Sequence, residues 1–176
     1  MKLLIASDIH GSAFWCERLM EEIERESPDR IVLLGDLLYH GPRNDLPRGH
    51  DPKRVVELLN GIAPNVLAVR GNCEAEVDQM VLDFPCMADY AVLMDGDYQL
   101  YLTHGHLWSP DNLPPLPADS AFLYGHTHVK QNEDVPNPAG GMVRCVNPGS
   151  VSLPKDGSNS YAIYENGRFE LRELRA

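Results

Sequence analysis

The sequence contains few cysteines, and they stand far apart. The four are Cys16, Cys73, Cys86 and Cys145, and no two of them have a Cys-x-x-Cys or zinc-knuckle spacing. This absence argues against a thiolate zinc site and against a disulfide scaffold. We therefore expect reduced thiols and a cytoplasmic protein.

Long apolar runs and an excess of positive charge are also absent. No stretch of about 18 apolar residues occurs, so we expect no membrane span. The chain has 15 Lys and Arg against 26 Asp and Glu, a net charge of -11. A surface this acidic repels phosphate backbones, which disfavours general binding to nucleic acids or anionic membranes. An acidic protein that acts on phosphate needs a local cation, for which metal ions are the usual source.

Several catalytic motifs are missing as well. There is no Gly-x-Gly-x-x-Gly or Walker A segment, so neither a dinucleotide oxidoreductase nor a P-loop NTPase is supported. Ser150 and Ser152 have no nucleophile-elbow context, which argues against serine hydrolysis. Neither His-x-His pair continues into the longer histidine cluster expected of a metallo-β-lactamase-like hydrolase.

The composition and patterning that are present indicate an α/β protein. With 176 residues, 43% hydrophobic and 23% charged, we expect one domain over residues 1–176. In the first half, strand patterns at residues 2–7, 30–34 and 65–69 alternate with helix patterns at 12–26, 52–62 and 74–82. Strands that alternate with helices favour parallel pairing.

The second half is dominated by strands. We expect a hairpin of residues 90–94 and 99–103, a proline-rich loop at 106–119, and strands at 122–124, 142–146, 161–164 and 169–174. The whole pattern predicts a four-layer α/β/β/α sandwich of two mixed sheets flanked by helices.

Seven polar side chains stand directly after predicted strands. They are Asp8, His10, Asp36, Asn72, His104, His126 and His128. Sites form at the carboxyl ends of strands in open α/β sheets, so we expect these side chains to converge. Carboxylate, imidazole and amide ligands suit manganese, iron or zinc, and two such ions can clamp a phosphoryl group during displacement. His106 forms a second His-x-His pair with His104 and is an alternative ligand.

The order of these motifs resembles that of the calcineurin-like metallophosphoesterase superfamily, and within it the small YfcE-type phosphodiesterases. The matching stretches are Ser7-Asp8-Ile9-His10-Gly11, Gly35-Asp36, His40-Gly41-Pro42-Arg43-Asn44, Gly71-Asn72-Cys73, Thr103-His104-Gly105-His106, Gly125-His126-Thr127-His128 and Asn147-Pro148-Gly149-Ser150. They extend over residues 7–150, most of the chain.

The resemblance implies a binuclear centre. Asp8, His10 and His128 would hold one ion, Asn72, His104 and His126 the other, and Asp36 would bridge both. A hydroxide between the ions would attack phosphorus in line, with Asp36 and Asn72 as the catalytic residues. The resemblance favours two divalent ions, manganese first, with iron, zinc or nickel as alternatives.

Cys73 departs from the superfamily pattern, in which many members carry a histidine that protonates the leaving group. A thiol is poorly matched to that role, so we expect diesters or activated aryl esters to be preferred. The alternative is that Cys73 is a small packed residue without a catalytic role.

Four further residues are candidates for substrate binding. His40, Arg43 and Asn44 lie in a Gly/Pro loop and could contact the phosphate or form a solvated turn. Trp108 could stack on the substrate or cover the edge of the core.

We therefore expect a metal-dependent phosphodiesterase that acts on a small phosphodiester, and we regard a homodimer as an open alternative to a monomer. The rival functions are a phosphomonoesterase acting on a nucleotide or phosphoprotein, and a non-catalytic scaffold of the same fold, as in the retromer subunit. All seven positions carry residues that can bind a metal, which disfavours the non-catalytic scaffold.

Overall fold

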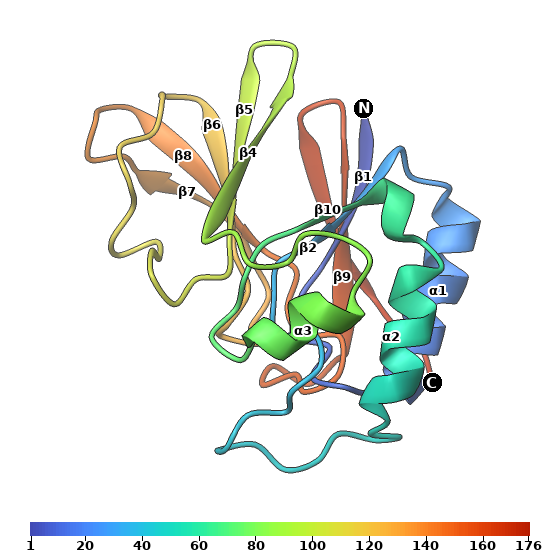
Figure 1. The fold of residues 1–176 in the computed structure, drawn as a ribbon. Helices are drawn as coiled ribbons and strands as arrows, with labels where there is room; N and C mark the ends of the chain where they lie inside the picture. Colours follow the sequence, from blue (N-terminus) through green and yellow to red (C-terminus); the bar gives the residue numbers. More distant parts are fainter.

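Two five-stranded sheets pack face to face in the computed structural model, which describes residues 1–176 (Figure 1). The first sheet consists, in spatial order, of β10 (Arg168–Glu173), β9 (Ser160–Glu165), β1 (Lys2–Ala6), β2 (Arg30–Leu33) and β3 (Val66–Ala68). The second consists of β4 (Tyr90–Asp95), β5 (Tyr98–Thr103), β6 (Ser120–Leu123), β8 (Met142–Asn147) and β7 (Gln131–Pro136). Each sheet joins parallel and antiparallel pairs. The predicted pair of stacked mixed sheets is confirmed.

Two of the three helices connect the parallel strands β1, β2 and β3 of the first sheet, and the third lies between β3 and β4 of the second sheet. The three helices are α1 (Ala13–Glu26), α2 (Pro52–Asn60) and α3 (Glu76–Val81), with a 3-10 turn at Ala63–Asn65. Asp51 caps α2 as its sequence predicts, because its carboxylate accepts a hydrogen bond from Arg54 N at 3.2 Å. Ser12 does the same for α1 through Trp15 N. The longest helix, α1, has 14 residues, and no helix combines the length and apolarity that a membrane span requires.

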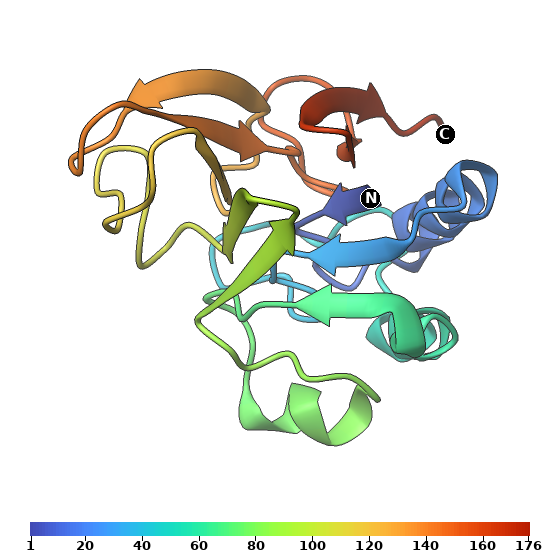
Figure 2. The ribbon, with the colours of Figure 1, turned by 90° about the horizontal axis from the view of Figure 1, so that it is seen from above.

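Three apolar clusters separate the layers. Side chains of β1 and β2 meet those of β5 and β6 between the two sheets. On the outer face of the first sheet, β1 and β2 pack against α1 and α2. On the outer face of the second sheet, Phe122 and Val143 pack beneath Leu113 and Leu116 of the proline-rich loop. Helices therefore cover one sheet, and a loop rather than a helix covers the other (Figure 2).

The strand β7 is the one strand that the sequence pattern does not predict. It pairs antiparallel with β8 at the edge of the second sheet. Its residues, Gln131–Pro136, are mostly polar and partly or fully exposed, so the strand shows no buried face to produce an alternating pattern. A proline at its end is tolerated because an edge strand leaves N–H positions unpaired.

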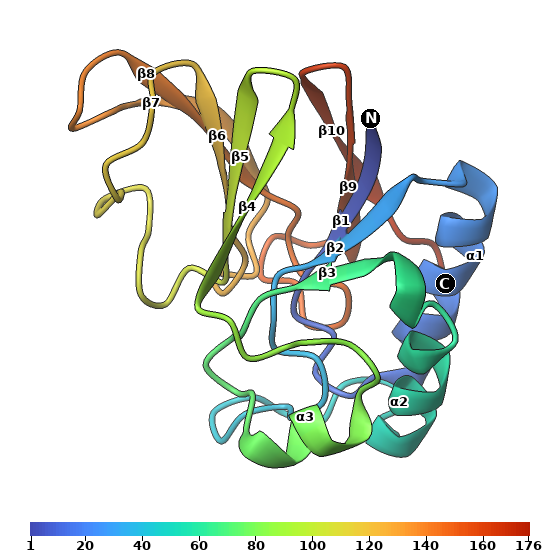
Figure 3. The same ribbon diagram turned by 45° about the horizontal axis from the view of Figure 1, so that its top comes forward.

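The parallel strands of both sheets deliver their carboxyl ends to the same side of the sandwich. The loops that leave β1, β2 and β3 gather there, and α3 lies beside α2 (Figure 3), joined to it by a hydrogen bond from Asn60 Nδ2 to Val81 O of 2.9 Å. The predicted helix 74–82 begins later, at Glu76, because the Glu74 side chain turns back to bind the backbone of the neighbouring loop.

Candidate metal centre

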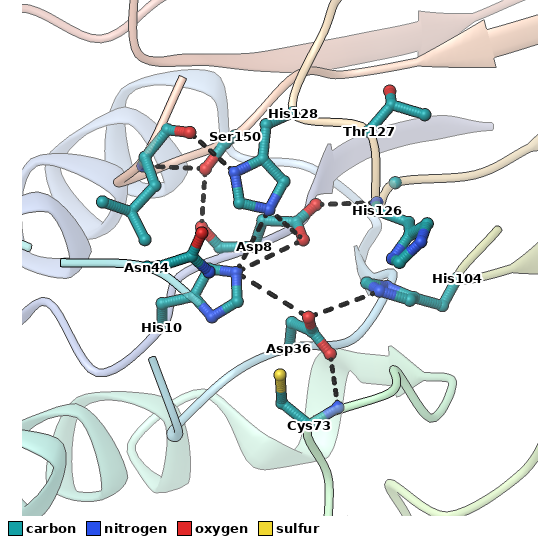
Figure 4. A network of polar contacts seen from close by, with 12 residues as sticks. Asp8, His10, Asp36, Asn44, Cys73, His104, His126, Thr127, His128 and Ser150 are labelled. Carbon is teal, nitrogen blue, oxygen red and sulfur yellow. Dashed lines mark hydrogen bonds and ion pairs between the residues drawn. The ribbon is translucent and has the colours of Figure 1, made fainter. Parts of the chain in front are cut away.

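The structure brings the seven strand-end side chains together at the carboxyl ends of the strands, and Figure 4 shows all of them except Asn72. His128 Nε2 lies 3.1 Å from Asp8 Oδ1. His104 Nε2 lies 3.2 Å from Asn72 Oδ1, and the ring of His126 is 5.1 Å from that of His104. Residues from five different strand ends therefore share one site.

The backbone of the site is unusual. Five of the seven residues have a left-handed backbone conformation: Asp8, His10, Asp36, His126 and His128, with φ between 50° and 66°. Such values are uncommon for residues other than glycine, and they accumulate at functional sites. The sharp turns aim side chains from several loops at one point.

Two glycines allow the loops to approach closely. A Cβ atom on Gly125 would lie 1.9 Å from Ser7 Oγ and 2.8 Å from Asp8 Oδ2. A Cβ atom on Gly71 would lie 2.1 Å from Asp36 Oδ1. Any side chain at these positions would push the two carboxylates out of place.

Three imidazoles are oriented by backbone carbonyl groups. Nδ1 of His10 contacts Tyr39 O at 2.8 Å, that of His104 contacts Leu34 O at 2.7 Å, and that of His128 contacts Leu153 O at 2.6 Å. A carbonyl oxygen only accepts, so each Nδ1 carries the proton. Once the ring is neutral, each Nε2 faces the carboxylates with a free lone pair, which is the usual arrangement of metal-binding histidines.

Asp36 lies between two groups of histidines. Its Oδ2 is 3.7 Å from His10 Nε2 and 3.4 Å from His104 Nε2. Its Oδ1 accepts a hydrogen bond from Cys73 N at 2.9 Å, which fixes the carboxylate. This is the position from which one carboxylate can contact two ions.

Asp8 provides a second sign that a cation belongs here. The side chain is fully buried, and its Oδ2 accepts a hydrogen bond from His126 N at 3.0 Å. Its Oδ1 is buried without a hydrogen-bond partner. An unsatisfied buried carboxylate oxygen among imidazole nitrogens is what a divalent cation would complete.

The protonation of the cluster follows from its charges. Burial raises the pKa of Asp8, but its contacts with His10 and His128 outweigh burial and hold the pKa well below the ordinary value. Burial lowers the pKa of His104, but Asp36 and Asp8 outweigh it and raise that pKa to about 9. Without metal, the positive charge of protonated histidine therefore offsets the negative charge of the carboxylates.

Three sets of potential ligand atoms lie within 4.8 Å of one another. They are Asp8 with His10 and His128, His10 with Asp36 and Cys73, and Asp8 with Asp36 and His104. The first set is the ligand set that the sequence predicts for one ion. The nitrogen and oxygen donors fit a divalent metal.

Residues that the sequence reasoning missed hold the site loops together. The Glu74 carboxylate accepts hydrogen bonds from Asp36 N at 2.8 Å, from Leu37 N at 2.7 Å and from Gly71 N. Ser150 Oγ donates to Asp8 O at 2.9 Å. The position of Glu74, directly after Gly-Asn-Cys, was the available signal, since that motif already belonged to the site.

A cavity of about 480 Å³ opens beside the centre. It is lined by Asp36, Gly41, Pro42, Arg43, Asn44, Asn72, Cys73, His126, Thr127, His128 and Lys155. Two of the predicted substrate-binding residues, Arg43 and Asn44, are on its wall. Lys155 is a cation that sequence reasoning missed.

The other candidates lie elsewhere. His40 lines a second cavity of about 520 Å³, together with Tyr39 and His50. Trp108 packs edge-on against Tyr101, with 6.2 Å between ring centroids, and so covers the second sheet. The ring of His106, the alternative ligand, is 5.4 Å from that of His104.

Known proteins resemble the chain in both sequence and structure. A family model described as the calcineurin-like phosphoesterase superfamily domain matches residues 1–167. The chain is 47% identical to phosphodiesterase YfcE of Escherichia coli K12 over 167 residues, 94% of this chain and 88% of that protein. A solved structure of YfcE, a phosphoesterase from E. coli, superimposes with a TM-score of 0.90 at 43% identity, covering 99% of this chain and 100% of that one. Vacuolar protein sorting 29 from Cryptosporidium parvum shares the fold, with a TM-score of 0.56 at 16% identity and 97% and 95% coverage.

Proposed function

Because the chain belongs to the calcineurin-like phosphoesterase superfamily, we propose that this metallophosphoesterase hydrolyses a small phosphodiester at a binuclear centre built around Asp36. The observation that carries the proposal is the position of Asp36 between His10 and His104. The similarity to phosphodiesterase YfcE favours a diester as substrate.

The residues present fit two divalent ions. Asp8, His10 and His128 would hold one ion, Asn72, His104 and His126 would hold the other, and Asp36 would serve both. When bound, such a pair of ions activates water for in-line attack on phosphorus and neutralises the developing charge. The ligand chemistry suits manganese, with iron, zinc or nickel as alternatives.

The cavity wall provides the remaining interactions with the substrate. The Arg43 guanidinium, on the loop after β2, donates to the non-bridging phosphoryl oxygens. The exposed amide of Asn72 donates to the same group from the opposite loop. Both residues therefore orient the phosphorus and stabilise charge that grows during the reaction.

Cys73 accounts for the proposed preference for diesters with good leaving groups. Its Sγ accepts a hydrogen bond from Asn72 Nδ2 at 3.2 Å, and burial together with the nearby Asp36 raises the pKa of the thiol. No imidazole occupies this position. Leaving groups that need little protonation are therefore favoured.

Hydrolysis of bis-p-nitrophenyl phosphate tests the proposal. Chelator-stripped protein should be inactive, Mn²⁺ should restore activity, and Asp36→Asn should lower the restored rate by at least about 100-fold. The matched control is Asp97→Asn, in the exposed turn between β4 and β5, which should retain the wild-type rate.

Two results would contradict the proposal. A rate on p-nitrophenyl phosphate well above the diester rate would identify a phosphomonoesterase. Folded protein that neither binds nor uses any divalent metal would instead favour a protein-interaction scaffold.

A further inference from the structure

The loop between β8 and β9 places a cation on the wall of the catalytic cavity that the proposed reaction does not use. This cation is Lys155, whose side chain is exposed. Its ammonium group forms neither a hydrogen bond nor an ion pair with the rest of the chain. Acidic residues outnumber basic ones by 26 to 15, so partners for a lysine are not scarce.

The nearest carboxylate in the sequence is already engaged. Asp156 follows Lys155 directly, but Lys130 binds it: Lys130 Nζ lies 2.8 Å from Asp156 Oδ1, and Lys130 N donates to Oδ2 at 2.6 Å. Lys130 Nζ also donates to Ser158 Oγ at 2.9 Å. Lys130 is thus paired with Asp156, while Lys155, on the cavity wall, has no such partner.

The backbone of Lys155 is fixed relative to the metal centre. Lys155 N donates to His128 O at 2.9 Å. Two residues earlier, Leu153 O accepts the hydrogen bond from His128 Nδ1 at 2.6 Å. Both the main chain and the ring of His128 therefore tie down this loop. The position of the lysine is set by the site, and only its side chain is free to move.

The shape and polarity of the cavity point in the same direction. A volume of about 480 Å³ leaves room beyond a phosphodiester group, since one water occupies about 30 Å³ in the liquid. Most side chains on the wall are polar or charged. The part of the substrate that fills the remaining space is therefore polar or charged.

We propose, on the basis of the phosphodiesterase function proposed above, that Lys155 binds a second anionic group of the substrate, separate from the scissile phosphodiester. A phosphodiester carries one negative charge, which the metal ions and Arg43 already neutralise. Another ammonium in the same cavity gains binding energy from another anion. The substrate class is thus a phosphodiester that also carries a phosphate or a carboxylate.

Calorimetric binding of three phosphonates to Mn²⁺-loaded protein tests this assignment without turnover. The probes are propylphosphonate, 2-carboxyethylphosphonate, in which a carboxylate replaces the methyl group, and ethane-1,2-bisphosphonate. Wild-type protein should bind at least one of the two probes with a second anionic group about tenfold more tightly than propylphosphonate, a difference of about 1.4 kcal/mol. A preference for the bisphosphonate alone identifies a second phosphate, and one for the carboxylate alone identifies a carboxylate.

The variant Lys155→Met should lose this preference while its affinity for propylphosphonate stays within about twofold of wild type. The matched control is Lys53→Met, an exposed lysine on the wall of the second cavity, which should keep the preference. Both variants remove one positive charge, so a difference between them reports position and not net charge.

Kinetics separate the failure of this inference from the failure of the proposed function. The substrates are p-nitrophenyl propyl phosphate and p-nitrophenyl 2-carboxyethyl phosphate. For a carboxylate-binding Lys155, KM for the second substrate should rise about tenfold in Lys155→Met, with kcat unchanged. Equal affinity of wild type for all three phosphonates, or an unchanged preference in Lys155→Met, would overturn the role of Lys155. If the wild-type protein hydrolyses neither ester, the proposed phosphodiesterase function itself is wrong.

Discussion

At the scale of single residues, Cys73 makes two contacts in the site, one through its backbone and one through its side chain. Its backbone N–H fixes Asp36 at 2.9 Å, and its side chain receives a hydrogen bond from Asn72. The first contact needs only a peptide bond, so any residue at this position could supply it. The second needs only a small acceptor.

The variant Cys73→Ser should therefore keep kcat on bis-p-nitrophenyl phosphate within about twofold of wild type. Serine preserves the backbone contact and offers an oxygen as acceptor. The measurement is steady-state hydrolysis of this ester and of an alkyl p-nitrobenzyl diester, whose leaving groups are poor. A large loss on the second substrate alone would show that the thiol protonates leaving groups.

The sequence was sufficient to predict which seven side chains the structure brings together, because each one combines a donor atom suited to a metal with a position just after a strand. The same reasoning does not reach Lys155, because lysine at the surface is ordinary and only the folded loop brings it to His128. His40 and Trp108 lie outside the cavity for a related reason. They stand in long loops, whose path depends on tertiary packing and not on local pattern.

At the scale of secondary-structure elements, Glu74 connects the loop after β2 with the loop after β3. Its carboxylate is buried and accepts from the backbone of Asp36, Leu37 and Gly71. No other side-chain hydrogen bond to these three N–H groups is present. The brace therefore fixes both the bridging carboxylate and the loop that carries Asn72.

Replacing Glu74 by Gln should lower the free energy of unfolding by about 2–3 kcal/mol. Both carboxylate oxygens of Glu74 accept hydrogen bonds from backbone N–H groups, whereas the amide of Gln has only one acceptor oxygen. Urea denaturation of the metal-free protein measures this change. The exposed Glu76→Gln, two residues along, is the matched control and should be neutral. Equal stability of the two variants would show that the hydrogen bonds of the Glu74 carboxylate do not stabilise the fold.

Elements with a buried face were predictable, and those without one were not. The strands β1, β2 and β5 have runs of buried residues, and their positions agree with the sequence pattern. The edge strand β7 has no such run. The covering layer of the second sheet was also beyond the pattern, because Leu113 and Leu116 bury apolar surface from a loop without helical spacing.

At the scale of the whole molecule, the negative charge buried at the metal centre affects both the stability of the fold and the binding of metal. The chain carries a net charge of -11, and two of its carboxylates, Asp8 and Asp36, are buried together. Only protons on histidine or bound cations can offset these two charges inside the protein. Stability and metal binding should therefore depend on pH in linked ways.

The direction of that dependence follows from the pKa values of the histidines. Burial lowers the pKa of His10 and His104, but Asp8 and Asp36 outweigh it and raise both values, that of His104 to about 9. A raised pKa gives stability that is complete below the unfolded value of about 6.5 and is lost as the pH rises towards the folded value. Burial lowers the pKa of His126, so the change in stability caused by this residue occurs at pH values below about 6.5. The metal-free protein should thus lose stability between about pH 6.5 and 8, before thiols of the unfolded chain deprotonate.

Metal binding should show the opposite trend, because an imidazole must lose its proton before its Nε2 can hold an ion. The rise in Tm on adding Mn²⁺ should be larger at pH 8 than at pH 6.5, measured by differential scanning calorimetry of chelator-stripped and reloaded protein. The variant His104→Asn, whose amide can still donate to Leu34 O, should show a smaller decline of metal-free stability over this range. A metal-free Tm that is constant or rises from pH 6.5 to 8 would mean that the buried carboxylates are not balanced by histidine protons.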